Sequence, residues 1–414
     1  SRFAPSDRYG YFPSVSLGWN VSKEPFWKFD RTDLKFRLSY GKTGNQDGIG
    51  NYAWQPLMSG GINYGNNSGM AVTSMGNNTL TWETADQYDF GFDLGFWNGK
   101  LNMIADVYLK NTNNLLYSMP LHGTSGFTSI TNNIGSMRNY GVEFSINGHM
   151  NLGKVNWTSS FNISHNKNKL TKLLGDDLLP IGSNRALKVG EELGAFYLFQ
   201  MDGIYQYDGE VPQPLYDLGV RAGDVKYHDV DNNGIINDSD RVLTGSSNPD
   251  FFGGWNNTFK YKGFQLDVFF TYMYGNDVYA EWAVTATRPG YRMAITEDAA
   301  KNRWTAPGSS NKYPRAVNTL CGHNSKNSTR FLEDGSFIRL RSLTFSYTFP
   351  QVMLQKIRMK GLRLHVQGDN LLLFSKYSGW DPEVSKNMDP QYFGVDLYGV
   401  PPSRSVNFGI NLSF

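Results

Sequence analysis

Hydrophobic and polar positions alternate in short runs along most of this chain, most clearly in its last residues, 403–414. Apolar side chains occupy every second position there: Val406, Phe408, Ile410, Leu412 and Phe414. Because successive side chains of a strand point to opposite faces, this run predicts a strand with one apolar and one polar face. Such a strand fits a soluble sandwich, or an outer-membrane barrel whose apolar face meets lipid. The bulky aromatic at the very end of the run favours the barrel.

The same two-residue period recurs upstream and predicts paired strands. Residues 88–96 and 101–109 alternate on either side of Asn98-Gly99, and an Asn-Gly pair between alternating runs is the strongest short-range hairpin signal. Further runs cover residues 14–21, 34–40, 140–146, 155–163, 252–261, 266–272, 343–349 and 362–366. We therefore expect about eleven spanning strands, each near the roughly 9 to 11 residues that a tilted barrel strand needs.

Long stretches without alternation separate these runs. They lie at about residues 44–80, 113–136, 168–249, 276–334 and 373–402. Their Gly and Asn content predicts exposed loops, with one short helix after Thr296 as its N-cap. Short turns alternate with these loops, and in outer-membrane barrels the short turns are periplasmic and the long loops extracellular. The pattern thus predicts an inward-running first strand and a periplasmic C-terminus.

Composition narrows the function classes. Aromatic residues make up 15% of the chain and charged residues only 18%, which is typical of a β-rich fold. The net charge of +2 gives no support to nucleic-acid binding. Cys321 is the only cysteine, so an intrachain disulfide and a thiolate zinc site are excluded. The sequence contains no apolar run of about 18 residues, so it predicts no membrane-spanning helix. The strands of a membrane barrel do not require such a run, because every second residue in them is polar.

Signatures of catalysis are missing from the sequence. Gly41-Lys42-Thr43 resembles the end of a phosphate-binding loop, but Phe36 stands where the first glycine belongs. The six histidines are scattered without a partner at metal-ligand spacing, and no Gly-x-Ser-x-Gly elbow occurs. We expect that the protein is not an enzyme.

Residues 229–240 carry the one metal-like motif. Its candidate ligands are the side chains of Asp229, Asp231, Asn233, Asn237 and Asp240 and the backbone carbonyl of Ile235. Gly234 at the sixth position permits the sharp turn of an EF-hand-type loop, and Ile236 is the aliphatic residue at the eighth. This spacing wraps oxygen ligands around one hard cation, so it predicts a structural Ca²⁺ (or Mg²⁺) site. A metal-free turn rich in Asp and Asn is the alternative.

Six short segments follow one another in order over most of the chain. They are LSYGKTGNQ (38–46), NYGVEF (139–144), GDVKY (223–227), NPDF (248–251), GSFIRL (335–340) and GDNL (368–371). As a series they resemble the C-terminal part of SusC/RagA-type TonB-dependent outer-membrane transporters. The resemblance implies an all-β fold: a transmembrane antiparallel barrel of 22 strands around a plug, to which residues 1–414 supply about eleven C-terminal strands. The plug, the TonB-contacting segment and the first half of the barrel are expected outside this sequence.

The resemblance also implies a function. It is the TonB-dependent import of a nutrient, an oligosaccharide or peptide, through the outer membrane, with a SusD-like surface lipoprotein as lid. Loops 276–334 and 373–402 are the expected contacts with that lid. A non-transporting outer-membrane barrel (adhesin or passive porin) and a soluble β-sandwich enzyme or lectin stay open as alternatives. Four loop tryptophans either stack on the substrate or pack within their loops: Trp54, Trp282, Trp304 and Trp380.

Overall fold

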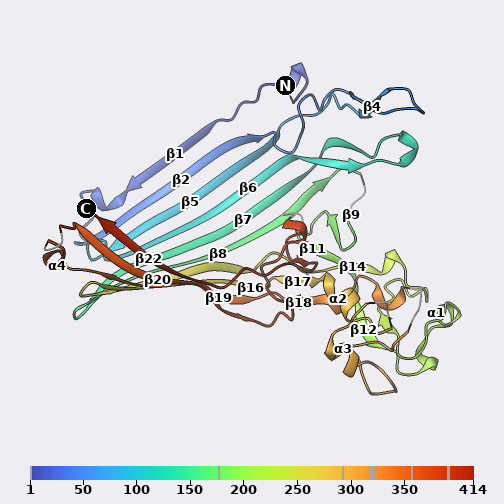
Figure 1. The fold of residues 1–414 in the computed structure, drawn as a ribbon. Helices are drawn as coiled ribbons and strands as arrows, with labels where there is room; N and C mark the ends of the chain where they lie inside the picture. The colour runs from blue at the N-terminus through green and yellow to red at the C-terminus, as the bar shows by residue number, and fades with distance from the viewer. Residues whose placement is uncertain (1, 176–177, 291–292, 318–321, 356–357, 389–391) are drawn as a thin grey trace. The chain divides into compact units, whose positions relative to one another are not determined.

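The computed structural model describes residues 2–175, 178–290, 293–317, 322–355, 358–388 and 392–414; Cys321 lies outside them. Eleven strands of the described part pair in sequence order in one sheet (Figure 1). They are β1 (Ser14–Asn20), β2 (Thr32–Asn45), β5 (Glu83–Phe96), β6 (Leu101–Pro120), β7 (Ser129–Leu152), β8 (Val155–Leu173), β15 (Phe251–Tyr261), β16 (Phe264–Tyr274), β19 (Phe337–Thr348), β20 (Gly361–Ser375) and β22 (Ser405–Ser413). The predicted all-β class and strand number are confirmed. Among the described residues, no helix has the length and apolar character to cross a membrane.

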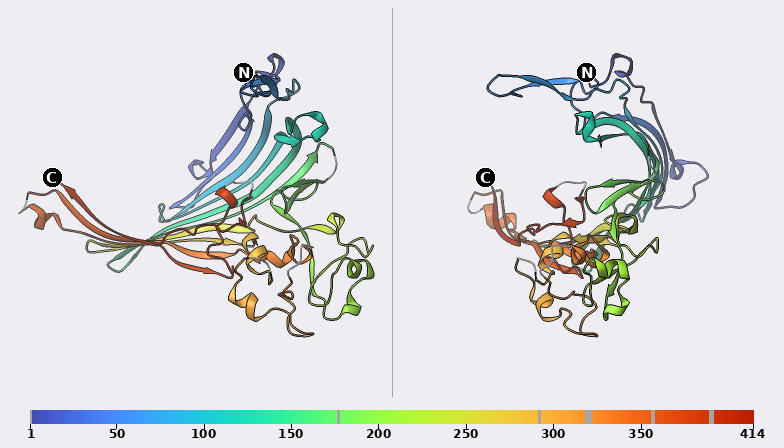
Figure 2. Two further views of the ribbon diagram at one scale, coloured as in Figure 1. Left: turned by 45° about the vertical axis from the view of Figure 1, so that its right-hand side comes forward. Right: turned by 90° about the vertical axis from the view of Figure 1, so that its right-hand side faces the viewer.

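The chain divides into two compact units. The first comprises Ser1–Gly148, Ser164–Leu179 and Leu187–Leu193, and the second comprises His149–Ile163, Pro180–Ala186 and Gly194–Phe414. Figure 2 shows the blue-to-teal strands of the first unit lying side by side. Each unit is described below by itself.

In the first unit, strand register collects the apolar side chains into rows. Leu38 pairs with Phe90, Phe90 with Val107, and Val107 with Val142 across β2, β5, β6 and β7. The neighbouring row in the same register is Tyr40, Tyr88, Leu109 and Tyr140. The four members of the first row are about half exposed, at 53, 48, 52 and 45%. The inner face of a soluble sandwich would be buried, so this face does not fit that alternative.

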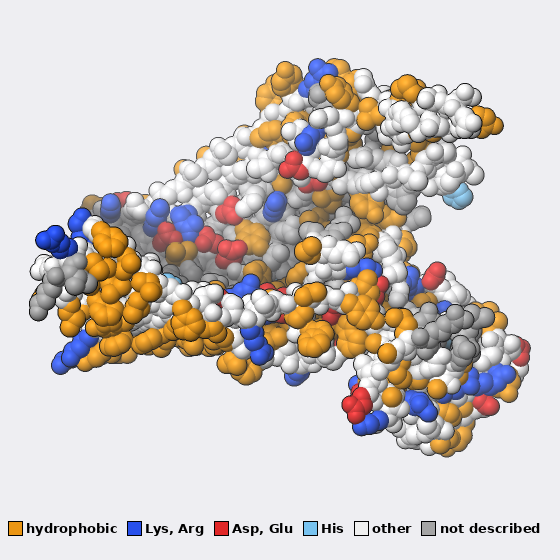
Figure 3. All heavy atoms as spheres, viewed as in Figure 1, with side chains coloured by type: hydrophobic (Ala, Val, Ile, Leu, Met, Phe, Trp, Pro, Cys, Tyr) orange, Lys and Arg blue, Asp and Glu red, His pale blue; other side chains and the backbone are white. Residues whose placement is uncertain are grey.

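The strands of the second unit follow the same rule. Leu266 pairs with Phe345, Phe345 with Val366, and Val366 with Phe408 across β16, β19, β20 and β22. Hydrophobic side chains gather over β20 and β22 in Figure 3. The polar residues that alternate with them, such as Gln265 opposite Ser346, point to the other face of the sheet.

The tight turns form where the sequence predicted them. Asn98 and Gly99 both adopt positive φ, 57° and 80°, between β5 and β6. Lys262 and Gly263 do the same between β15 and β16, with φ of 45° and 88°. Lys262 and Gly263 alone connect the paired residues Tyr261 and Phe264, and two positive φ values are what such a two-residue type I′ turn requires. The turn between β5 and β6 is longer: it comprises residues 97–100, and Trp97 also has a positive φ, 53°.

The predicted loop at residues 113–136 is wrong. β6 continues to Pro120 and β7 begins at Ser129, so only residues 121–128 connect them. The expected strand length also fails for β7, which has 24 residues. Residues 111–118 do not alternate in polarity, yet their backbone stays in the ladder through irregular pairing at Asn113 and Leu115. The ladder therefore extends beyond the region that a two-residue apolar period marks.

The expectation of irregular, exposed loops at 168–249 and 276–334 is also wrong. These segments contain short strands: β9 (Leu178–Ile181), β10 (Arg185–Lys188), β11 (Ala195–Phe199), β12 (Met201–Ile204), β13 (Val225–Tyr227), β14 (Arg241–Ser246), β17 (Asp277–Ala280) and β18 (Leu332–Asp334). The helices α1 (Gln213–Asp217), α2 (Glu281–Ala286) and α3 (Glu297–Lys301) belong to them as well. Thr296 caps α3 as predicted, since its side chain accepts a hydrogen bond from the Ala299 amide. Elsewhere lie β3 (Leu57–Gly60), β4 (Met70–Ser74), α4 (Gln351–Gln355) and β21 (Val395–Asp396).

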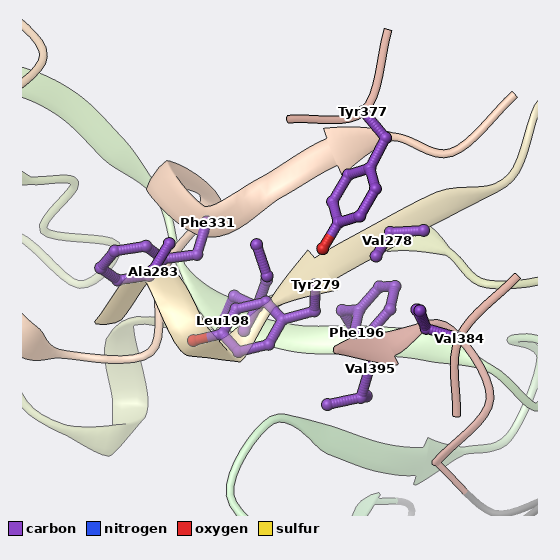
Figure 4. Packing of buried hydrophobic residues seen from close by; sticks show 10 residues of the cluster. Phe196, Leu198, Val278, Tyr279, Ala283, Phe331, Tyr377, Val384 and Val395 are labelled. Atoms are coloured by element: carbon purple, nitrogen blue, oxygen red, sulfur yellow. The ribbon is translucent and has the colours of Figure 1, made fainter. Parts of the chain in front are cut away.

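Two hydrophobic cores explain this order in the second unit. One core joins β11, β17, α2 and β21, with Phe196 and Tyr279 fully buried at its centre (Figure 4). The other joins α1, β13 and residues 199–236, around Val225 and Tyr227. The residues of each core are far apart in sequence, so no local period signals them.

Candidate functional site

The Asp-rich segment 229–240 forms a compact loop between β13 and β14. Asn232 and Gly234 adopt left-handed backbone conformations, with φ of 56° and 78°. Glycine, and to a lesser degree asparagine, accept this region at low cost, which lets the chain turn back on itself twice in three residues. The loop ends in a short 3-10 helix, Asp238–Asp240, that Asn237 caps by accepting a hydrogen bond from the Ser239 amide.

Three of the predicted ligands converge. Carboxylate oxygens of Asp229, Asp231 and Asp240 all lie within 4.8 Å of one another. Calcium binds oxygens at about 2.3 to 2.6 Å, so two of its ligands are separated by at most about 5 Å. The three carboxylates therefore fit within the coordination sphere of one such ion.

Backbone amides hold these carboxylates in place. Asp229 accepts hydrogen bonds from Gly234 at 2.7 Å and from Asn233 at 3.2 Å. Asp240 accepts from Val230 with one oxygen and from Asn237 with the other, at 2.9 and 2.8 Å. Each carboxylate oxygen has further lone pairs, so these bonds orient the ligands without using them up.

The remaining predicted ligands have other described contacts. The Asn233 side-chain oxygen accepts from the Ile235 amide at 2.7 Å, and its amide group donates to Asp231 at 2.8 Å. Ile235 is exposed, whereas the next residue, Ile236, is buried in the core around Val225. The aliphatic position of the motif thus anchors the loop to that core.

The local electrostatics favours the ionised form of Asp229. Burial acts to raise the pKa of Asp229, but hydrogen bonds, led by the one from the Gly234 amide, hold that pKa below its usual value. Asp240 is fully buried, and no described Lys, Arg or His lies within ion-pair distance of it. Burial, together with the charges of Asp202 and Asp229, raises the pKa of the nearby Tyr205 to about 12. The donor set is all oxygen and suits a hard cation, not a soft one.

A buried ion cluster was not predicted from the sequence. The Arg339 guanidinium on β19 lies 2.6 Å from Asp381 and 3.0 Å from Glu383, and the Arg339 and Asp381 side chains are 3% and 5% exposed. Arg341 sits at an irregularity of the pairing with β20 and also reaches Glu383, at 3.3 Å. Arg339 falls in the GSFIRL segment, but nothing local in the sequence links that segment to Asp381.

The polar face of the first unit carries a second charged array. Arg37 on β2 contacts Asp93 on β5 and Asp106 on β6, each at 2.9 Å. Ser39, two residues beyond Arg37 on β2, donates to its cross-strand partner Asp89 at 3.1 Å. Acidic and basic side chains over these strands are visible in Figure 3.

Two of the four loop tryptophans contact residues of other connecting segments. Trp282 donates to the Tyr377 hydroxyl and Trp304 to the Gln206 side chain, both at 3.1 Å. Trp380 is 79% exposed. The Trp54 ring nitrogen is buried without a hydrogen-bond partner among the described residues.

A family model and several curated relatives match this chain. Residues 2–371 match the family described as TonB dependent receptor-like, beta-barrel. The chain is 33% identical to TonB-dependent receptor P3 of Formosa agariphila, covering all of this chain and 43% of that protein. It is 30% identical to TonB-dependent receptor SusC of Bacteroides thetaiotaomicron, again over the whole chain and 41% of that protein. The chain thus spans less than half the length of these relatives.

A solved structure extends the likeness to the fold. The structure of the RagAB peptide transporter matches this chain with a TM-score of 0.85 and 27% identity, covering 100% of this chain and 44% of that one. The same importer in its "open-open" state matches with a TM-score of 0.79.

Proposed function

Since this chain belongs to the TonB-dependent receptor, β-barrel family, we propose that it is part of an outer-membrane transporter that imports an oligosaccharide or a peptide by TonB-dependent active transport. The observation that carries the proposal is the likeness over the whole chain to SusC and to the RagAB peptide transporter. The SusD-like lid is part of the same proposal, with loops 276–334 and 373–402 as its contacts.

Two features of the strands support a place in a larger barrel. β1 and β22 stand at the two ends of the strand order, each with one described neighbour. The apolar rows on both units are exposed or partly exposed, as side chains facing lipid are. In the proposed arrangement the two end strands pair with the preceding half of the barrel, which surrounds the plug. The tight turns face the periplasm, as does the C-terminus.

Uptake by the full-length protein tests this function. Deletion of its gene should abolish growth on one glycan or peptide as sole nutrient, and collapse of the proton-motive force should stop uptake in the wild type. The runner-up, an adhesin or passive porin, predicts uptake that does not depend on TonB, or none at all. Extraction of the protein into buffer without detergent would refute both readings.

We further propose that residues 229–240 bind Ca²⁺ (or Mg²⁺) through Asp229, Asp231, Asn233, Ile235, Asn237 and Asp240. The convergence of three carboxylates around one point supports it, because their mutual repulsion opens the loop unless a cation is bound. The ion braces the loop and takes no part in transport. Millimolar external calcium would fill even a weak site.

Calcium-dependent proteolysis tests the site. With Asp229→Ala and Asp240→Ala together, protease nicking within residues 224–245 should rise to the level that a chelator produces in the wild type. Asp238→Ala is the matched control, because that side chain is 89% exposed and outside the ligand set. If the wild type is nicked equally with and without calcium, the metal site is refuted and the loop is a metal-free turn.

A further inference from the structure

The apolar face of the first unit carries a shallow, open groove. Its volume is about 490 Å³, and its walls include Leu38, Tyr88, Phe90, Val107, Leu109 and Tyr140. These residues belong to the two apolar rows of β2, β5, β6 and β7, so the groove runs across four neighbouring strands. An apolar concavity on an already apolar face provides a bed for a flexible hydrocarbon chain.

A row of charged and polar residues lies directly beyond the tyrosines. In the same strand register it consists of Lys42, Asp86, Asn111 and Arg138. Asp86 lies 3.9 Å from the Lys42 ammonium and offsets its charge. Tyr40 donates to the same carboxylate at 3.0 Å, so the tyrosine row and the polar row are joined.

Arg138 differs from Lys42 in its surroundings. Its Nε atom donates to the Asn111 side chain at 2.8 Å, which fixes the guanidinium at the rim of the groove. None of the described carboxylates lies within ion-pair distance of Arg138. Its remaining donors form a planar fork suited to bidentate contact with phosphate.

We propose that this groove binds one phosphorylated membrane lipid, with an acyl chain in the groove and the phosphate on Arg138. The inference rests on the proposed membrane function, which puts these rows in lipid and the long-loop end of the strands at the outer surface. Tyrosines prefer the boundary between hydrocarbon and headgroups, so the tyrosine row marks the level where a phosphate would lie. A peptide would leave its backbone groups unpaired against these apolar walls, and a sugar would lack hydrogen-bond partners there.

Three soluble probes distinguish the contribution of the acyl chains to binding from that of the phosphate. Full-length protein purified in detergent is mixed with dioctanoyl phosphatidic acid, with dioctanoylglycerol or with inorganic phosphate, and bound molecules are counted by native mass spectrometry. Phosphatidic acid should bind best, because it alone offers both the chains and the charge. Binding of inorganic phosphate as tight as that of phosphatidic acid would overturn the proposal in favour of a simple anion site.

Variants assign the binding to the groove. Arg138→Gln should weaken phosphatidic acid binding roughly tenfold, the size of effect expected for losing hydrogen bonds to a charged group. Lys110→Gln is the matched control, since Lys110 lies one residue along β6 from Leu109 and points to the opposite face. Val107→Trp fills the groove but keeps Arg138, and should also weaken binding. Equal phosphatidic acid binding by the Arg138 and Lys110 variants would refute the lipid site. The proposed transport function fails separately, if the wild-type protein shows no TonB-dependent uptake.

Discussion

The strands of the large sheet expose apolar side chains, whereas the segments that connect them bury side chains of the same types. Phe408 on β22 is 84% exposed, whereas Phe196 on β11 is fully buried in the core that joins β11, β17, α2 and β21. The strands leave their apolar rows exposed, and in the proposed arrangement membrane lipid covers them. The connecting segments instead build cores of the kind found in soluble domains. Their stability is therefore set by internal packing, and that of the strands by ladders and lipid.

The largest expected effect separates these two uses of phenylalanine. Phe196→Ala removes a fully buried ring and should lower the free energy of unfolding of its core by about 3 to 5 kcal/mol. Protease nicking within residues 194–250 and 275–336 should rise, while the barrel still migrates as a folded species in unheated gels. The matched change Phe408→Ala removes an exposed ring and should leave nicking unchanged. If the Phe408 variant were nicked as much, the contrast between the two regions would be wrong.

A buried charge pair gives the next largest effect. Asp381→Asn leaves Arg339 buried with only Glu383 as an acidic partner, and breaking such a pair costs about 3 kcal/mol. We expect increased hydrogen exchange in residues 377–385, which carry Asp381. Glu297→Gln breaks the exposed pair with Lys301 on α3 and should cost less than about 1 kcal/mol. Comparable exchange in both variants would show that burial of the Arg339 pair does not matter.

A smaller effect concerns the tight turn between β5 and β6. Gly99 has φ of +80° with no atom closer than 3.9 Å to an added Cβ, so only backbone strain opposes Gly99→Ala. That strain costs roughly 1 kcal/mol and should slow refolding into lipid vesicles. Gly148→Ala is the control, because it lies within β7 without a positive φ and its Cβ would meet Leu101 at an ordinary 3.8 Å. Equal refolding rates would mean that this turn is not formed early.

The strands could be predicted from the sequence because their signal is local. An exposed row such as Leu38, Phe90 and Val107 leaves a two-residue period in each strand, and Asn98-Gly99 marks the turn beside it. The loop 229–240 was equally visible, because its candidate ligands follow one another within a few residues. The cores around Phe196 and Val225 were not visible, since contact between distant segments leaves no period in either.

The same distinction holds within the candidate sites. Asp381 lies 42 residues from Arg339, and only the three-dimensional fold brings the pair together. The sequence did not predict where β6 ends and β7 begins, for a related reason. Their ladder continues beyond the rows of apolar side chains, and hydrogen bonds between backbones do not depend on alternation.

The smallest expected effect is a pH dependence confined to the connecting segments. His323 is buried, and burial lowers its pKa from the usual 6.5, partly offset by a hydrogen bond to Val225 and by the charge of Asp224. A carbonyl can only accept, so Nε2 of His323 donates to the Val225 oxygen, at 2.8 Å. The folded protein thus keeps the ring neutral at a pH where the unfolded chain takes up a proton. Stability is complete above about pH 6.5 and is lost as the pH falls toward the lower pKa of the folded state.

Hydrogen exchange at the Val225 and Tyr227 amides should therefore speed up between pH 7.5 and pH 5.5, after correction for intrinsic rates. His323→Gln keeps a donor for the Val225 carbonyl but cannot titrate, so it should remove the pH dependence even if it lowers stability at every pH. His149→Gln, at an exposed position on β7, should leave it intact. Because the spanning strands contain no part of this core, their protection should not change over the same range. A pH response shared by strands and connecting segments would point to a global effect instead of to His323.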